Sequence, residues 1–242
     1  MNLAERLIVA LDVSTAQEAL GIVDSLGDVA SYYKVGMQLY NSEGPEMVKQ
    51  LTGRGKQVFV DLKFHDIPNT AAQAGGVLTR LGVTMFNLHV AGGRVMMKET
   101  LAKAEEEAAK MGIVRPKIIG VTILTSMNQQ QFAEDLGYQM PVKDKVREWS
   151  LMAQEVGLDG VVASAAELPL IREYCGNEFL VVTPGIRPSW SVTNDQQRIV
   201  TPRDAIKMGA SHIVVGRPIY GNDNPRAAAL KILAEMEEGL SC

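Results

Sequence analysis

The chain has 242 residues, of which 46% are hydrophobic and 21% charged, with a formal net charge of −4. This composition is typical of a globular protein with a sizeable core, and its mild acidity gives no electrostatic reason to expect a nucleic-acid or membrane partner. No apolar run approaches the ~20 residues of a spanning helix, and residues 1–6 lack a signal segment. Cys175 and Cys242 are too few for a disulfide framework, so we expect a cytoplasmic protein with free thiols.

Short apolar runs alternate with helical segments along the whole chain. The predicted strands are, in order, residues 7–11, 32–35, 58–60, 85–90, 117–124, 160–163, 179–183 and 212–215. The predicted helices are residues 15–26, 42–52, 69–81, 94–110, 129–136, 142–156, 165–174, 202–208 and a last helix that Asn224 caps. No linker or change of composition interrupts this series.

The alternation predicts a single-domain (β/α)8 TIM barrel over residues 1–242, because such barrels follow each strand with a helix and typically need ~250 residues. A doubly wound open sheet is the alternative architecture. It is less well supported, because no Gly-rich dinucleotide-binding turn follows the first strand.

Local signals make more detailed predictions about three helices. Ser42 is expected to cap the helix 42–52. The acidic run 105–107 is expected to face solvent. In the last helix, the apolar residues expected to point inward are Leu230, Leu233 and Met236.

The sequence changes abruptly after the third predicted strand. The apolar run 58–60 is followed within a few residues by Asp61, Lys63, His65 and Asp66. Residues two apart in a strand point the same way, so Asp61 and Lys63 should lie side by side. An ion pair at a strand end is the purely structural interpretation. The density of charge favours a catalytic centre, because each uncompensated buried ion costs several kcal/mol.

In a (β/α)8 barrel the active site lies at the carboxyl ends of the strands. The polar residues and glycines predicted there are Asp12, Lys34, Asp61, Lys63, His89, Thr125, Gly185, Arg187, Gly216 and Arg217. After the last two strands, Gly185 and Gly216 permit close backbone approach, while Arg187 and Arg217 supply forked cationic donors. Loops at this place commonly bind phosphate in this fold, so we predict a phosphate site.

The segment 186–198 has little apolar periodicity, and a loop of this length beside a phosphate site favours a lid. Gln196 within it is a candidate contact for phosphate or for a carbonyl of the ligand. The simpler interpretation of Gln196 is a loop amide that faces solvent.

The histidines give weaker signals. His65 is expected to support the charged cluster from outside, and His89 to contact substrate or, by slight preference, the backbone. His212 begins a strand and therefore belongs to the opposite, stabilising end of the barrel. No pair of histidines has metal-ligand spacing.

The decapeptide Asp61-Leu62-Lys63-Phe64-His65-Asp66-Ile67-Pro68-Asn69-Thr70 resembles the orotidine 5′-monophosphate decarboxylase family. The resemblance extends over essentially the whole chain, through the segments 11–12, 34–36, 124–126, 183–188 and 215–217. The decapeptide is highly specific, whereas a Gly-Arg pair alone would not be. The sequence does not depart from the family at the positions that the family uses.

The resemblance implies a homodimeric enzyme that makes uridine monophosphate from orotidine 5′-monophosphate without cofactor or metal. It implies a charged network of Lys34, Asp61, Lys63 and Asp66 of the partner subunit, in which Lys63 donates the proton. The substrate-binding residues that it implies are Asp12, Lys34 and Thr70 of the partner subunit for the ribose, Thr125 for the pyrimidine, Arg187, Gln196, Gly216 and Arg217 for the phosphate, and more generally Asp61, Asp66 and Ile67.

Two alternatives remain open. A sugar-phosphate decarboxylase of the same superfamily also carries the Asp-x-Lys-x-x-Asp pattern but uses Mg²⁺ to stabilise an enediolate. His65, the run 67–70 and Gln196 favour the nucleotide enzyme. A catalytically silent nucleotide-binding barrel would keep the phosphate residues but has no need for Lys63.

Overall fold

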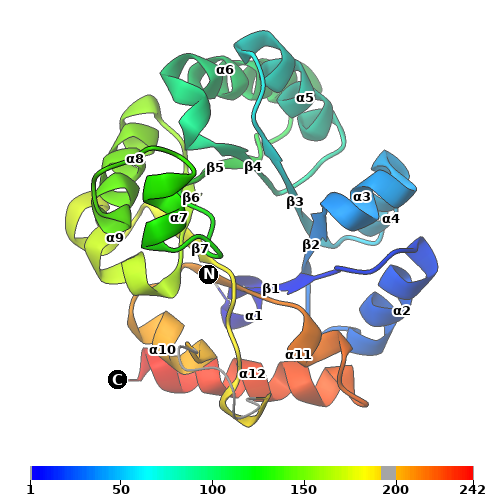
Figure 1. The fold of residues 1–242 in the computed structure, drawn as a ribbon. Coiled ribbons are helices and arrows are strands. Elements are labelled where there is room, and N and C mark those ends of the chain that lie inside the picture. Colours follow the sequence, from blue (N-terminus) through cyan, green and yellow to red (C-terminus); the bar gives the residue numbers. More distant parts are fainter. Residues whose placement is uncertain (1, 192–199, 242) are drawn as a thin grey trace.

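The computed structural model describes residues 2–191 and 200–241, and these residues form a closed barrel in which eight parallel strands follow one another in chain order (Figure 1). The strands are β1 (Leu7–Ala10), β2 (Tyr32–Gly36), β3 (Gln57–Phe64), β4 (Met85–His89), β5 (Lys117–Val121), β6 (Gly160–Val162), β7 (Leu180–Thr183) and β8 (His212–Val215). β8 pairs with β1 and closes the barrel, with Ile213 opposite Leu7. The predicted (β/α)8 architecture is confirmed.

Helices surround the strands on the outside of the barrel (Figure 1). The α-helices are α1 (Leu3–Arg6), α2 (Ala16–Leu26), α3 (Met37–Glu43), α4 (Pro45–Gly53), α5 (Pro68–Arg80), α6 (Gly93–Met111), α7 (Gln129–Glu134), α8 (Val142–Val156), α9 (Leu168–Cys175), α10 (Pro202–Lys207), α11 (Arg217–Tyr220) and α12 (Pro225–Leu240), and the 3-10 turns are η1 (Val90–Gly92), η2 (Ala165–Glu167) and η3 (Ser189–Ser191). Across the described residues, none of these helices combines the length and apolar character needed to cross a membrane.

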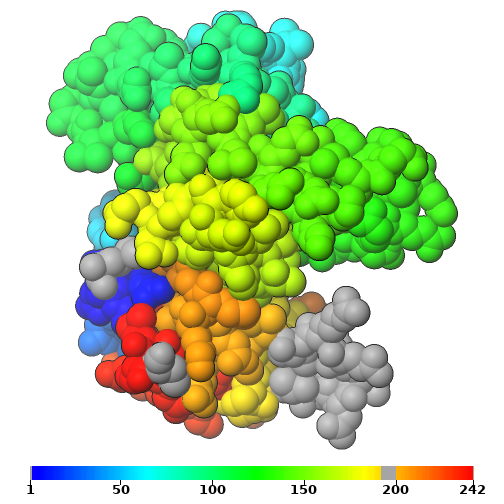
Figure 2. Space-filling model, turned by 90° about the vertical axis from the view of Figure 1, so that its left-hand side faces the viewer, coloured from blue at the N-terminus to red at the C-terminus, as the bar shows by residue number. Residues whose placement is uncertain are grey.

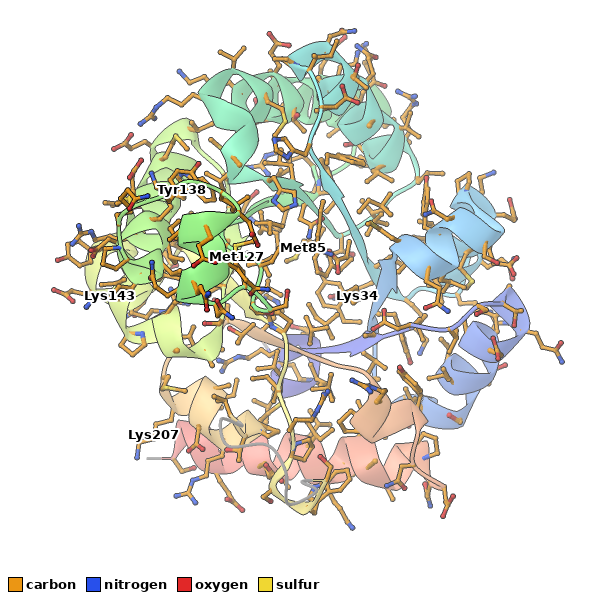
Figure 3. The ribbon with its side chains drawn as sticks, in the orientation of Figure 1. Lys34, Met85, Met127, Tyr138, Lys143 and Lys207 are labelled. Carbon is orange, nitrogen blue, oxygen red and sulfur yellow. The ribbon has the colours of Figure 1, made fainter. Side chains whose placement is uncertain are left out.

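The strands separate two apolar regions because successive side chains alternate between their faces. The larger region lies between strands and helices and includes Leu7, Val9 and Val35. The smaller region fills the barrel interior with Ile8, Ala10, Tyr32, Phe59, Met85, Ile119, Val182 and Val214. The same alternation places Lys34, Asp61 and Asn87 two residues beyond Tyr32, Phe59 and Met85, so polar side chains follow the apolar layer toward the carboxyl ends of the strands. Figure 3 shows Lys34 and Met85 pointing into the barrel.

The prediction that Ser42 caps a helix is wrong. Ser42 lies inside α3, and its hydroxyl donates a hydrogen bond to the Ser14 carbonyl over 2.6 Å. The segment forms two helices that meet at Gly44, whose φ of 65° ends α3 before Pro45 begins α4. Proline at the start of α4 needs no hydrogen-bond partner for its nitrogen, so the Gly-Pro pair sets the boundary.

The acidic run 105–107 does not face solvent throughout, because Glu107 is buried. Its carboxylate lies 2.9 Å from Arg80 Nη1 and 2.8 Å from Lys103 Nζ. A side chain at Gly76 of α5 would come within 3.3 Å of Glu107, so this glycine lets α5 and α6 approach closely. The close approach buries Glu107 in an ion-pair network between the two helices.

The inward face of α12 was predicted only in part. Met236 is buried and Leu233 half-buried, but Leu230 is 51% exposed. The other buried residues of this face are Ala228, Ala229, Ile232 and Gly239. α12 packs closely on α10, and a side chain at Gly239 would meet the Arg203 carbonyl, so this contact requires glycine.

His212 lies at the amino-terminal end of β8, as predicted, with its ring edge-on to Tyr32 at a centroid distance of 5.9 Å. Burial lowers the pKa of His212 to about 4 from 6.5, and the nearby charge of Arg6 acts in the same direction. Its Nδ1 has no hydrogen-bond partner among the described residues. The folded chain therefore favours the neutral imidazole.

We expect His212 to make the fold sensitive to acid. In the unfolded chain His212 binds a proton below pH 6.5, whereas in the folded chain it stays neutral down to about pH 4. The folded state is therefore progressively destabilised as the pH falls through this window. Between about pH 7 and about pH 5 this group alone should lower the free energy of unfolding by about 2 kcal/mol. Urea unfolding of the wild type and of His212→Gln at one protein concentration will measure this. An unchanged pH dependence in His212→Gln would contradict it.

Candidate active site

Four charged side chains form a continuous series at the carboxyl ends of β1, β2 and β3. Lys34 Nζ lies 2.9 Å from Asp12 Oδ1 and 3.4 Å from Asp61 Oδ2. Lys63 Nζ lies 2.7 Å from the other oxygen of the same carboxylate, Asp61 Oδ1. The structure therefore brings together the acids and lysines that the sequence placed at three separate strand ends.

The series keeps its charges because each member has an opposite charge beside it. Burial alone would lower the pKa of Lys34, but Asp61 and Asp12 outweigh it and raise that pKa above its ordinary value. Burial would likewise raise the pKa of Asp61, but Lys34, Lys63 and a hydrogen bond from Asn87 hold it below its ordinary value. Asp61 is therefore an anion that fixes two ammonium groups.

Asn87 of β4 is a member of this site that the sequence argument missed. It is 1% exposed, and its side-chain amide donates to Asp61 Oδ1 over 2.7 Å. Its Oδ1 accepts a hydrogen bond from the backbone nitrogen of Lys63 over 2.8 Å. One signal in the sequence pointed to it, since a lone amide within the apolar run of residues 85–88 must find partners when buried.

The histidine pair beside the series is formed by His65 and His89, whose ring centroids are 5.3 Å apart. His65 is exposed and His89 half-buried. Burial, His65 and Lys63 together lower the pKa of His89. The slight preference for a backbone hydrogen bond from His89 was wrong within the described part of the chain, where its ring faces His65 instead.

The predicted phosphate residues lie beyond β7 and β8. Gly185 has a φ of 77°, and a side chain at Gly216 would come within 3.3 Å of Ala10 and of the Tyr220 ring, so both places suit glycine. Burial raises the pKa of Tyr220, Asp12 raises it further, and Arg217, Lys34 and Arg187 oppose the rise. These charges therefore act on Tyr220, which the sequence argument did not single out.

Gln196 and most of the predicted lid lie in residues 192–199, outside the described part of the chain, as does Cys242. The described beginning of the segment is attached to α12. The Ser189 hydroxyl donates to the Glu235 carboxylate over 2.9 Å, and Lys231 lies over the Trp190 ring.

The loop between β3 and α5 carries predicted residues that the chain does not bring to Lys63. Asp66 accepts a hydrogen bond from the Ile67 backbone nitrogen over 2.7 Å and forms no ion pair with the described residues. Ile67 is 67% exposed, and Asp66 and Thr70 are exposed as well. An acid, a large apolar side chain and a hydroxyl thus lie together on an uncovered loop.

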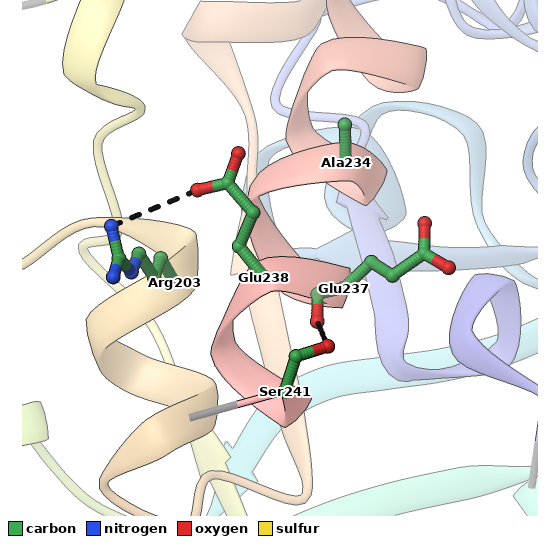
Figure 4. Close-up of a pocket in the computed structure, with 5 residues that line it drawn as sticks. All are labelled: Arg203, Ala234, Glu237, Glu238 and Ser241. Atoms are coloured by element: carbon green, nitrogen blue, oxygen red, sulfur yellow. Dashed lines mark hydrogen bonds and ion pairs between the residues drawn. The ribbon is translucent and has the colours of Figure 1, made fainter.

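The loop after β5 forms another part of the rim. Thr125 is exposed in it, and the adjoining segment around α7 projects from the body of the molecule in Figure 2. A separate surface groove of about 580 Å³ lies away from these strand ends, between α10 and α12, and is lined by Arg203, Ala234, Glu237, Glu238 and Ser241 (Figure 4). Residues 2–191 and 200–241 contain no cluster of three or more acidic, histidine or cysteine side chains suited to a metal ion.

Comparison with known proteins identifies the family. The profile of the "Orotidine 5′-phosphate decarboxylase / HUMPS family" matches residues 5–232. The chain belongs to this family. Among curated relatives, the orotidine 5′-phosphate decarboxylase of Syntrophomonas wolfei is 51% identical over 239 residues, covering 98% of this chain and 100% of that protein. The enzyme of that name from Moorella thermoacetica is 46% identical, covering 98% and 94% of the two chains.

Solved structures agree with the membership of the orotidine 5′-phosphate decarboxylase family. The orotidine 5′-phosphate decarboxylase of Lactobacillus acidophilus superposes with a TM-score of 0.86 at 36% identity, covering 96% of this chain and 99% of that one. An uncharacterised conserved protein from Geobacillus kaustophilus gives 0.84 at 38% identity, with coverages of 95% and 99%. The resemblance carried by the decapeptide 61–70 is thus confirmed at the level of the family.

Proposed function

We propose that the chain decarboxylates orotidine 5′-monophosphate to uridine 5′-monophosphate and CO₂, the last step of de novo pyrimidine nucleotide synthesis, in the cytoplasm. The supporting observation is the Lys63 ammonium, held 2.7 Å from Asp61 at a barrel end, in a chain of the orotidine 5′-phosphate decarboxylase family. The whole chain, residues 1–242, acts as one catalytic barrel.

The reaction breaks the bond between C6 of the pyrimidine and its carboxylate. The electron pair remains on C6 in an orbital of the ring plane, where no carbonyl can delocalise it. An ammonium group at C6 stabilises this charge electrostatically and then supplies the proton that forms the new C–H bond. In our proposal Lys63 is that group, and it recovers its proton from water after the products leave.

Asp61 and Lys34 serve this step without a metal or cofactor. Asp61 is an anion beside Lys63 and directs its ammonium group through a hydrogen bond of 2.7 Å. Both Asp61 oxygens already face cationic or amide donors, namely Lys34, Lys63 and Asn87. This arrangement favours an ammonium-based reaction over the Mg²⁺-dependent sugar-phosphate chemistry.

The remaining substrate contacts follow the rim. Lys34 and Asp12, joined over 2.9 Å, hold the ribose hydroxyls, and Thr125 contacts the pyrimidine. The phosphate is bound by Gly216 together with Arg187, Gln196 and Arg217. Phosphate and ribose are remote from C6, so their binding energy serves to position the ring and close the site.

The exposed loop between β3 and α5 completes the site of a second subunit. Asp66, Ile67 and Thr70 are uncovered in one chain, and Asp66 lacks an ion-pair partner among the described residues. In an isologous homodimer the same loop of each subunit can reach the other barrel. Asp66 of the partner subunit then joins the charged network, Thr70 of the partner subunit binds the ribose and Ile67 of the partner subunit lines the site.

Turnover of orotidine 5′-monophosphate, followed as the loss of orotate absorbance, tests the proposed function directly. We expect wild-type protein to convert the nucleotide completely and to release stoichiometric CO₂. Binding without any turnover would instead identify a catalytically silent nucleotide-binding barrel.

We expect exhaustive chelation to leave this activity unchanged, because the Lys63 ammonium provides the positive charge at the reacting carbon. Protein treated with EDTA and then desalted should show the turnover number of untreated protein. A loss of activity that added Mg²⁺ restores would favour the sugar-phosphate enzyme, in which the metal stabilises an enediolate.

A further inference from the structure

The backbone of β3 is irregular where it carries the reactive lysine. Lys63 has a φ of 54° and is the one non-glycine residue with positive φ among the described residues. β3 also shifts its register against β4, since Val60 pairs with Phe86 whereas Phe64 pairs with Leu88. An L-residue in the left-handed region costs about 1–2 kcal/mol, so other contacts must hold Lys63 there.

Asn87 lies on β4 between the two pairing positions, opposite the irregular part of β3. The Lys63 backbone nitrogen carries a proton and can only donate, so the amide atom that faces it at 2.8 Å is the acceptor Oδ1. The Asp61 carboxylate can only accept, so the atom that faces it at 2.7 Å is the donor Nδ2. Both amide groups are therefore used, and each serves a different residue of β3.

We propose that Asn87 is a positioning residue, which holds the Lys63 backbone in its left-handed conformation and the Asp61 carboxylate in one orientation. The ammonium of Lys63 is then aimed by two links, its own backbone and the Asp61 oxygen at 2.7 Å. This inference rests on the proposed role of Lys63 as proton donor. A primary amide meets the requirement because it combines a donor and an acceptor in one short, neutral side chain.

Replacement by aspartate separates the two functions of the amide. An ionised Asp at position 87 would still accept from the Lys63 nitrogen, but it would repel Asp61 instead of donating to it. A protonated Asp at position 87 would have both an O–H donor and a carbonyl acceptor, as the amide has. Asn87→Asp should therefore recover activity when acid protonates the added carboxyl group.

The groups that surround position 87 act on this titration in known directions. Asp61 raises the pKa of an added carboxyl group, and the cations Lys63 and Lys34 lower it. His89 on the same strand lowers it further whenever its ring is protonated. On the other side β5 is apolar, with Ile119 paired with Asn87.

The experiment measures kcat and KM for orotidine 5′-monophosphate from about pH 5 to about pH 8, together with the affinity for uridine 5′-monophosphate. The variants are Asn87→Asp and the isosteric, apolar Asn87→Leu. Exposed Asn177→Asp, in the loop before β7 at the amino-terminal end of the barrel, is the matched control for the added charge. Wild-type turnover in the same assay tests the proposed function separately.

We expect both Asn87 variants to lose about 10²-fold in kcat near neutral pH, with product affinity changed less than about threefold. The ratio of Asn87→Asp to wild-type kcat should rise as pH falls, while the ratio for Asn87→Leu stays constant. If Asn87→Leu does not fold, the pH dependence of the kcat ratio between Asn87→Asp and wild type still tests the proposal. A constant ratio for Asn87→Asp, a kcat near that of wild type or a loss confined to KM would overturn the proposal.

Discussion

Lys63→Ala and Asp66→Asn will each be severely impaired as homodimers but will regain activity when they are mixed. Loss of a general acid alone costs ~10²–10⁴-fold in rate, and Lys63 is also the proposed electrostatic partner of the developing charge. Asp66 is exposed in its own chain, where it accepts a hydrogen bond from the Ile67 backbone nitrogen and forms no ion pair with the described residues. In the proposed dimer it completes the neighbouring site instead.

Exchange of subunits between the two variants creates heterodimers. Each heterodimer has one site with both substitutions and one site with wild-type Lys63 and wild-type Asp66. Random pairing of equal amounts should therefore restore roughly a quarter of the wild-type sites in a two-fold dimer. Activity assays before and after subunit exchange measure the recovery of turnover. Mass spectrometry verifies that the heterodimer has formed.

Each variant alone, taken through the same dissociation and reassociation, is the control for this experiment. Neither should gain activity, because every site in a homodimer carries the same defect. If heterodimers form and activity does not return, Asp66 acts within its own chain and the shared site is wrong.

Arg217→Ala should lower kcat/KM for the nucleotide by about 10²-fold, because hydrogen bonds to a charged group typically contribute about 1.5–3 kcal/mol. The loss should appear in both KM and kcat, since remote binding energy is proposed to position the ring. Arg217 is exposed beside Gly216 and electrostatically coupled to Tyr220. No comparable loss is expected from Arg54→Ala, whose guanidinium pairs with Asp24 outside the site.

The nucleoside orotidine, which lacks the phosphate, provides the decisive comparison for Arg217. Wild-type protein should convert it far more slowly than the nucleotide, and Arg217→Ala should not slow it further. If Arg217→Ala impaired nucleoside and nucleotide equally, the arginine would not act through the phosphate.

The barrel and much of its rim were predictable because both follow from regular alternation. Period-two patterning in the strands places Lys34 and Asp61 on the inner face, and helix signals such as Asn224 mark the connections. Once the strands close into a barrel, residues far apart in sequence necessarily meet at its carboxyl end. The charged residues that meet there are Asp12, Lys34, Asp61 and Lys63.

The unpredicted features depend on how closely particular elements approach one another. Glu107 is buried because glycines bring α5 and α6 together, and Leu230 lies outside the face of α12 that packs on the barrel. The sequence marks Asn87 only as a lone amide in an apolar run, and its two partners become evident once β4 lies beside the irregular end of β3. Hydrophobic periodicity carries no information on such distances.

The left-handed backbone of Lys63 also bears on the stability of the fold. Glycine populates positive φ without a Cβ penalty, so a chain selected for stability alone would favour glycine there. A lysine at φ 54° is the less stable choice, and its backbone nitrogen donates a hydrogen bond to Asn87 Oδ1 on the next strand. If Lys63 is the proton donor that we propose, residue 63 is a place where thermodynamic stability and catalysis oppose each other.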